Sequence, residues 1–251
     1  MYIQQIIFLA LVGSFAGFIG IFAGGGGLIT LPSMMLFGFP VQSCIGANKF
    51  ALTCSGVTNS IVIIREKRVS RQLLLTAAVF GACGGVVGGV VTTNIDEKFM
   101  NIIVLILLIF ALFITLLKIP SDGKEDRKSP VKLDWRQRFF AFLIGIYDGG
   151  FGPGSSTLGI VMFMRNGFRY IQSAHITRVM LLGSNGAAMI VYLQSGYMRW
   201  QMIVPLTIGV IVGSQAALLL LPKISLRKAK ILLTTVTVLL ILQVLLKVIP
   251  H

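Results

Sequence analysis

The sequence predicts an all-α integral membrane protein made of two inverted repeats, and three observations support that prediction. Hydrophobic residues make up 55% of the 251-residue chain, charged residues make up 12%, and the mean hydropathy is +0.89. Apolar runs of about 20 residues, enough to cross the hydrocarbon core as a helix, recur along the chain. Two glycine clusters interrupt this pattern at related positions. A soluble domain of this size carries far more charge, so we expect the bilayer to be its solvent.

Seven apolar windows are long enough to cross the membrane as helices. Windows of sufficient length occur at approximately 3–23, 44–64, 72–93, 99–118, 173–195, 200–221 and 228–249. The first window has no basic segment before it, so we interpret it as a membrane helix and not as a secretory signal. Shorter apolar stretches at 28–39, 139–147 and 153–164 lie beside the glycine clusters and are interpreted as half-helices.

A polar linker divides the chain into two halves. Residues 118–138 carry seven Lys/Arg, several acidic residues and two prolines, which makes this the one strongly polar stretch. The predicted organisation is therefore a first transmembrane repeat at 1–118, a linker at 119–137 and a second repeat at 138–251.

An internal repeat relates the two halves. An offset of 125 pairs Gly24, Gly25 and Gly27 with Gly149, Gly150 and Gly152, and an offset of 129 pairs Lys49 with Arg178 and Gly84 with Gly213. Each repeat is thus predicted to have four elements: a broken or re-entrant helical hairpin followed by three transmembrane helices.

The charge distribution predicts that the repeats are inverted. The formal net charge is +14, and the basic residues gather between the apolar runs, where they indicate topology and lipid-headgroup contacts and not a nucleic-acid surface. In the inverted arrangement the cytoplasmic loops hold seventeen Lys/Arg, against three outside. We therefore expect a multi-pass protein of the plasma (inner) membrane with a cytoplasmic linker and both termini outside.

The glycine clusters are the candidate substrate site. Glycine disfavours a helix interior, and broken backbone at membrane depth is tolerated only where it faces protein or a water-filled cavity. Half-helices that begin near the bilayer centre direct their N-terminal dipoles toward one point, which suits an anion. The cluster residues assigned to substrate binding are Gly24, Gly25, Gly26, Gly27, Asp148, Gly149, Gly150, Gly152, Pro153, Gly154, Ser155 and Ser156. Five other glycines are assigned to close helix packing instead: Gly81, Gly84, Gly85, Gly88 and Gly89.

Two cations inside the membrane extend this site. Lys49 and Arg178 occupy equivalent positions in the two halves, and we assign them to anion binding together with their neighbours Asn48 and Thr177. Snorkelling of each cation to the interface is the alternative. The single intramembrane carboxylate, Asp148, is expected to pair with Arg178 or Lys49 or to cap the half-helix, in preference to carrying a coupling proton.

The motifs resemble a known family. Residues 17–27 (GFIGIFAGGGG), Pro32, residues 46–49 (GANK) and residues 145–154 (GIYDGGFGPG) together resemble the sulfite exporter TauE/SafE family of membrane permeases. The resemblance extends over essentially the whole chain. It implies a plasma-membrane permease for sulfur-containing or organic anions such as sulfite, sulfoacetate or related sulfonates, without a catalytic cofactor.

The predicted function is therefore a secondary transporter of a small anion, and not an enzyme. One alternative is an intramembrane hydrolase that uses Ser155 or Ser156 with His175 as base. Another is a cation permease that uses glycine-loop carbonyls, although intramembrane carboxylates are scarce and two buried cations would repel the substrate.

Further expectations concern partners and thiols. Membrane lipids are expected as partners; a coupling proton or sodium ion and a homodimer stay open; no metal or nucleic acid is expected. The cysteines Cys44, Cys54 and Cys83 lie in apolar stretches without C-x-x-C spacing, so we expect them to be buried free thiols.

Overall fold

A computed structural model describes residues 3–23, 26–66, 68–116, 132–220, 234–240 and 242. Within these residues the chain forms helices and no strand, as expected for an all-α protein. The helices are α1 (Ile3–Ala23), α2 (Gly27–Leu36), α3 (Val41–Glu66), α4 (Arg71–Thr93), α5 (Glu97–Leu116), α6 (Trp135–Gly150), α7 (Ser155–Arg165), α8 (Tyr170–Gln194) and α9 (Trp200–Leu220).

Most of the predicted spans are present. Five described helices are long and apolar enough to cross a membrane: α1, α4, α5, α8 and α9. The span predicted at 44–64 corresponds to α3, which has 26 residues. It contains Asn48, Lys49 and Asn59, so it is more polar than those five helices. The seventh, 228–249, lies mostly outside the described residues. The predicted half-helix at 139–147 is longer than expected, because α6 begins at Trp135 and continues to Gly150.

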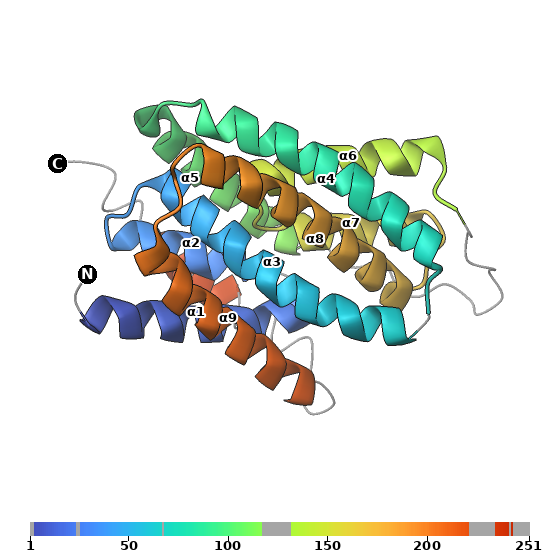
Figure 1. Ribbon diagram of the computed structural model, residues 1–251, viewed down its shortest axis with the longest axis horizontal. Helices are drawn as coiled ribbons and strands as arrows, with labels where there is room; N and C mark the ends of the chain where they lie inside the picture. Colours follow the sequence, from blue (N-terminus) through green and yellow to red (C-terminus); the bar gives the residue numbers. More distant parts are fainter. Residues whose placement is uncertain are drawn as a thin grey trace.

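The helices pack in pairs along the bundle. Helix α9 crosses and packs against α1, and α4 packs against both α6 and α8, while α3 packs against α8 and α9 (Figure 1). Each close pair joins a helix from before the linker to a helix from after it. The two halves of the chain therefore form one interwoven bundle.

Glycines allow these helices to approach closely. A Cβ atom on Gly84 would overlap the carbonyl oxygen of Phe142 in α6, and one on Gly85 would overlap that of Ser184 in α8. Gly213 of α9 meets α1 in the same way, at Ser14. The assignment of the α4 glycines to helix packing is thus confirmed, since any side chain would push the backbones apart.

The outer surface of the bundle is apolar. Large hydrophobic side chains such as Leu75, Ile106 and Phe113 are 60–66% exposed. In water so much exposed apolar surface would be unfavourable, whereas lipid solvates it. This outward face also contains Cys83, so the expectation that it is buried is wrong. All three cysteines are free, as expected; Cys44 is buried and Cys54 is half-buried.

The chain breaks at both glycine clusters, as predicted. Helix α1 ends at Ala23 and α2 begins at Gly27; Gly24 and Gly25 lie outside the described residues. In the second cluster four residues, 151–154, separate the end of α6 from the start of α7, and they include Gly152 (φ +106°) and Gly154 (φ +85°). These left-handed conformations favour glycine, which explains why the chain can turn sharply there.

Candidate functional site

The tips of the two broken helices meet inside the bundle. We call residues 26–27 the first tip and residues 151–154 the second tip. A Cβ atom on Gly27 would lie 3.3 Å from Pro153 Cγ of the second tip and 3.3 Å from Asn48 Nδ2 of α3. The described cluster residues of both tips are buried, apart from the half-buried Gly26. The tips thus lie within the protein and not at its surface.

Helix α3 places one side chain against each tip. Asn48 reaches Gly27 of the first tip, as above. Its neighbour Lys49 reaches the second tip, because a Cβ atom on Gly152 would lie 2.8 Å from Lys49 Nζ. Lys49 is 0% exposed, so it does not snorkel to the interface. Two consecutive residues of one helix therefore connect the two tips.

Lys49 pairs with Asp148 at the end of α6. Its ammonium donates a hydrogen bond to the backbone carbonyl of Asp148 and lies 3.8 Å from the carboxylate Oδ2. Of the roles expected for Asp148, the structure shows pairing with Lys49. A buried charge without a partner costs several kcal/mol, so each of these residues accounts for the burial of the other.

The Asp148 carboxylate also connects α6 to α7. Ser155 Oγ, in the first turn of α7, donates to Asp148 Oδ1 at 2.7 Å. The other oxygen, Oδ2, is shielded from solvent and accepts no hydrogen bond from any described residue; Asp148 as a whole is 1% exposed. Ser155 thus positions one oxygen of the carboxylate and leaves the second toward Lys49.

The first tip has a matching hydroxyl that the sequence interpretation overlooked. Thr30 Oγ1, in the first turn of α2, donates to Asn48 Oδ1 at 2.9 Å. The Asn48 Nδ2 amide has no partner among the residues that the structure describes. The signal was available, because the offset of 125 that relates the glycine clusters also aligns Thr30 with Ser155.

Hydroxyl groups donate hydrogen bonds to backbone carbonyls of the second cluster. Tyr147 Oη donates to Pro153 O at 2.6 Å, while Tyr192 Oη and Thr92 Oγ1 donate to Gly150 O at 3.3 and 3.1 Å. Tyr192 and Thr92 come from α8 and α4, so nothing in the local sequence of the cluster indicates their role. Because these carbonyls are already bonded, the cluster offers few oxygen acceptors to a cation.

Both half-helices start without a side-chain cap. The residues before their first turns, Gly26 for α2 and Gly154 for α7, make no capping side-chain hydrogen bond. The first amides of a helix lack intrahelical partners and carry the positive end of its dipole. The site therefore combines two positive helix ends with the donors of Asn48 and Lys49.

The equivalent residues of the second half lie in a different setting. Thr177 is buried against Gly159 of α7, and its Oγ1 has no hydrogen-bond partner in the described part of the chain. Arg178 is half-buried and lies near Glu66 at the end of α3 and Tyr170 at the start of α8. The structure thus brings Lys49 to the tips and places Arg178 near the end of α3.

The side chains named for the hydrolase alternative are engaged elsewhere. Ser155 donates to Asp148, and His175 Nε2 lies 3.7 Å from Glu66 Oε2. The serine and histidine thus have separate partners, and Ser156 is half-buried in the first turn of α7. This arrangement does not favour a Ser–His nucleophile.

Membrane-length helices, an apolar outer face and a buried charge pair between α3 and α6 define a polytopic helical membrane protein with a buried polar site. The chain belongs to the sulfite exporter TauE/SafE family, whose model matches residues 9–244.

Curated relatives agree with this family. The chain is 31% identical over 209 residues to "Probable membrane transporter protein ORF9" of Sinorhizobium sp, and the matched region covers 83% of this chain and 80% of the relative. It is 28% identical over 217 residues to a "Probable membrane transporter protein" of Haemophilus influenzae, with 84% and 83% coverage. It is 27% identical over 217 residues to "Probable membrane transporter protein YfcA" of Escherichia coli K12, with 82% and 77% coverage.

Proposed function

We propose that this protein is a secondary transporter of a small anion, such as sulfite or a sulfonate, and that the anion binds between the two tips. The observation that carries the proposal is the position of Lys49: a fully buried cation at the meeting point of two uncapped helix N-termini. The membership of the family and the printed names of the relatives support the transport class.

The donors at the tips suit a group with several oxygens. Lys49 Nζ is a charged donor, and Asn48 Nδ2 is a donor without a partner among the described residues. The first turns of α2 and α7 add the positive ends of their dipoles, although the Ser155 N–H itself donates to Gly152 O. Sulfite and sulfonates present three oxygens on one sulfur, and charge-assisted bonds to such groups are strong. In the described conformation the carboxylate of Asp148 pairs with Lys49. A substrate anion would share Lys49 with this carboxylate or displace the carboxylate from it.

Alternating access would expose this closed site. Lys49, Asn48 and Asp148 are at most 1% exposed, so an anion can enter only when the tips separate. We propose that the halves are inverted repeats, with a cytoplasmic linker at 119–137, and that one moves against the other. The pairing of α1 with α9 and of α6 with α4 supports this, because each joins the first helix of one repeat to the fourth helix of the other.

Charge balance favours a proton as the coupling ion. The Lys49–Asp148 pair is neutral overall, so a bound monovalent anion adds one uncompensated negative charge in a region of low dielectric. A proton on Asp148 Oδ2 restores neutrality, and the protonated oxygen becomes a donor. The described titratable groups next to this carboxylate include Lys49 of α3 and Tyr147 of α6, and the Tyr147 phenol donates to the Pro153 carbonyl.

Anion flux into proteoliposomes tests the proposal. Sulfite, a sulfonate and a carboxylate of similar size would be compared for wild type, Lys49→Met and Arg178→Ala, with membrane insertion checked for each. Lys49→Met is expected to abolish saturable flux. Lys98→Met, an exposed lysine at the start of α5, removes the same charge and should leave flux intact.

A neutral double variant controls for the possibility that Lys49→Met loses flux because it misfolds. Lys49→Met/Asp148→Asn removes both charges, so no buried charge is left unpaired. It is expected to fold and still to lack flux. Flux at the wild-type rate in this variant would exclude Lys49 as the anion ligand.

A further inference from the structure

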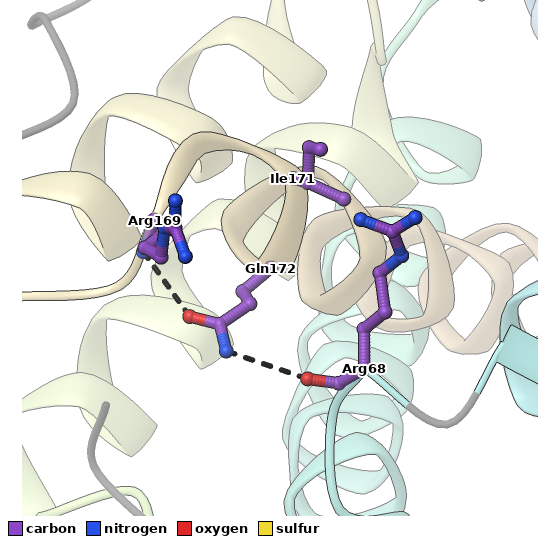
Figure 2. Close-up of a pocket in the computed structure, with 4 residues that line it drawn as sticks. All are labelled: Arg68, Arg169, Ile171 and Gln172. Carbon is purple, nitrogen blue, oxygen red and sulfur yellow. Dashed lines mark hydrogen bonds between the residues drawn. The ribbon is translucent and has the colours of Figure 1, made fainter. Parts of the chain in front are cut away.

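A second basic site lies at one end of the bundle, away from the tips. A cavity of about 300 Å³ is lined by Arg68, Arg169, Ile171 and Gln172. Arg68 follows the end of α3 and Arg169 precedes α8, so the cavity lies where the α3–α4 and α7–α8 connections meet. Figure 2 shows the two arginines on opposite sides of Gln172.

Hydrogen bonds fix the two connections together. Gln172 Nε2 donates to the carbonyl of Arg68 at 3.3 Å, and Gln172 Oε1 accepts from the backbone N–H of Arg169 at 3.2 Å (Figure 2). One side chain thus contacts both chain segments and sets the spacing of the arginines. Because the segments come from opposite sides of the linker, the cavity joins the two halves.

The lining of the cavity combines positive charge with apolar surface. The Arg68 side chain is 53% exposed, and its Nε also lies 2.9 Å from Glu66 Oε2. The guanidinium has five donors, so this single bond leaves others for a ligand. Ile171 is 44% exposed beside the arginines. A cationic rim next to an exposed aliphatic side chain matches the boundary between phosphate headgroups and acyl chains.

We propose that this cavity binds the phosphate of an anionic phospholipid, such as phosphatidylglycerol. The two guanidinium groups hold the phosphate oxygens, for which their planar fork is suited, and Ile171 contacts the start of an acyl chain. A phosphate held by both arginines bridges the two halves and stabilises the described arrangement. This inference does not depend on what the tips bind.

Thermal unfolding of the purified protein in a neutral detergent tests the site. Phosphatidylglycerol, phosphatidylcholine and inorganic phosphate would each be titrated, and the shift in Tm would give an apparent affinity. Wild type is expected to be stabilised saturably by phosphatidylglycerol, and much less by the other two. An equal shift from inorganic phosphate would overturn the lipid assignment, and no shift from phosphatidylglycerol would overturn the site.

Matched arginine variants separate a site from general electrostatics. Arg68→Gln/Arg169→Gln should weaken phosphatidylglycerol binding by roughly thirtyfold, the order expected when two cations near a lipid surface are lost. The control is Arg71→Gln/Arg165→Gln, which removes two exposed arginines that border the same connections but do not line the cavity. Equal weakening in both pairs would show diffuse attraction and refute the proposal.

A charge-preserving pair covers the case in which the glutamine variant does not fold. Arg68→Lys/Arg169→Lys keeps the net charge but lacks the guanidinium fork. We expect it to bind phosphatidylglycerol measurably more weakly than wild type. Unchanged binding would contradict the assignment of the phosphate to these two side chains.

Discussion

Lys49 in α3 and Asp148 in α6 form an ion pair whose side chains are 0% and 2% exposed, although 99 residues separate them in the sequence. The pair joins the first half of the chain to the second at the point where the two tips meet. Several measurable consequences follow from this contact and from the packing around it.

The ion pair should contribute strongly to stability as a unit. Lys49→Met leaves the Asp148 carboxylate buried without its cation, and removal of one partner of such a pair costs about 3–5 kcal/mol. Asp148→Asn in the same chain should recover most of that loss. Unfolding in detergent would measure both, and additive losses in the double variant would contradict the pairing.

Asp148→Asn should uncouple transport from protons. In the proposed cycle Asp148 takes up one proton with each monovalent anion, so the wild type accumulates anion when the outside is more acidic. An asparagine cannot be protonated, and the variant should equilibrate anion without accumulating it against a gradient. Its flux should also respond to membrane potential, because an uncompensated charge now crosses. Unchanged accumulation would assign coupling elsewhere.

Thr30→Val should weaken anion binding and largely preserve the fold. The change keeps the shape of the side chain but removes the hydroxyl that donates to Asn48 Oδ1, so Asn48 loses its orientation. A loss of about 1.4 kcal/mol corresponds to a tenfold higher KM for anion flux. Thr76→Val is the control, because its hydroxyl is exposed and bonds only to Gln72 within α4.

Gly84→Ala should disrupt the packing of α4 against α6. The new methyl group would overlap the Phe142 carbonyl of α6, and overpacking of this kind costs about 1–3 kcal/mol. The expected result is a lower Tm. Gly186→Ala in α8 is a matched control, since its Cβ would meet only Thr53 Cγ2, at an ordinary 3.8 Å. Equal effects of the two substitutions would argue against close contact of α4 and α6.

Cysteine labelling should test the inverted topology. In a background without the native cysteines, Arg199→Cys is predicted to react with an impermeant thiol reagent added outside. Arg68→Cys is predicted to react only after the membrane is permeabilised. Both residues are exposed, so accessibility does not limit the reaction. Labelling of residue 199 from the cytoplasm would reverse the orientation.

Local sequence predicted the helices and their breaks with good accuracy. The window at 72–93 became α4 (Arg71–Thr93), and the window at 173–195 became α8 (Tyr170–Gln194). Helix length in a membrane follows from the thickness of the hydrocarbon, and glycine-rich backbone breaks a helix wherever it occurs. Prediction was weaker at the start of α6, where Trp135 and Arg136 continue the helix beyond the apolar run.

Contacts between distant helices were harder to predict. The sequence left Asp148 with a choice between Lys49 and Arg178, because both cations occupy equivalent positions in the two repeats. It likewise gave no reason to connect Thr92 or Tyr192 with Gly150, since these residues belong to other helices. The exposure of Cys83 depends on which face of α4 is turned outward. The sequence of α4 is apolar on every face, so it does not indicate which one that is.

The sequence by itself determined that this is a multi-pass helical membrane protein of the sulfite exporter TauE/SafE family, with a broken helix in each half. Composition, periodicity and glycine placement act locally, so they can be interpreted without coordinates. Only the tertiary structure decided that the tips touch, that Lys49 pairs with Asp148, and that Arg178 lies near Glu66. The physical reason is that lipid solvates every helix alike, so close packing and the pairing of buried polar groups select the neighbours of each helix.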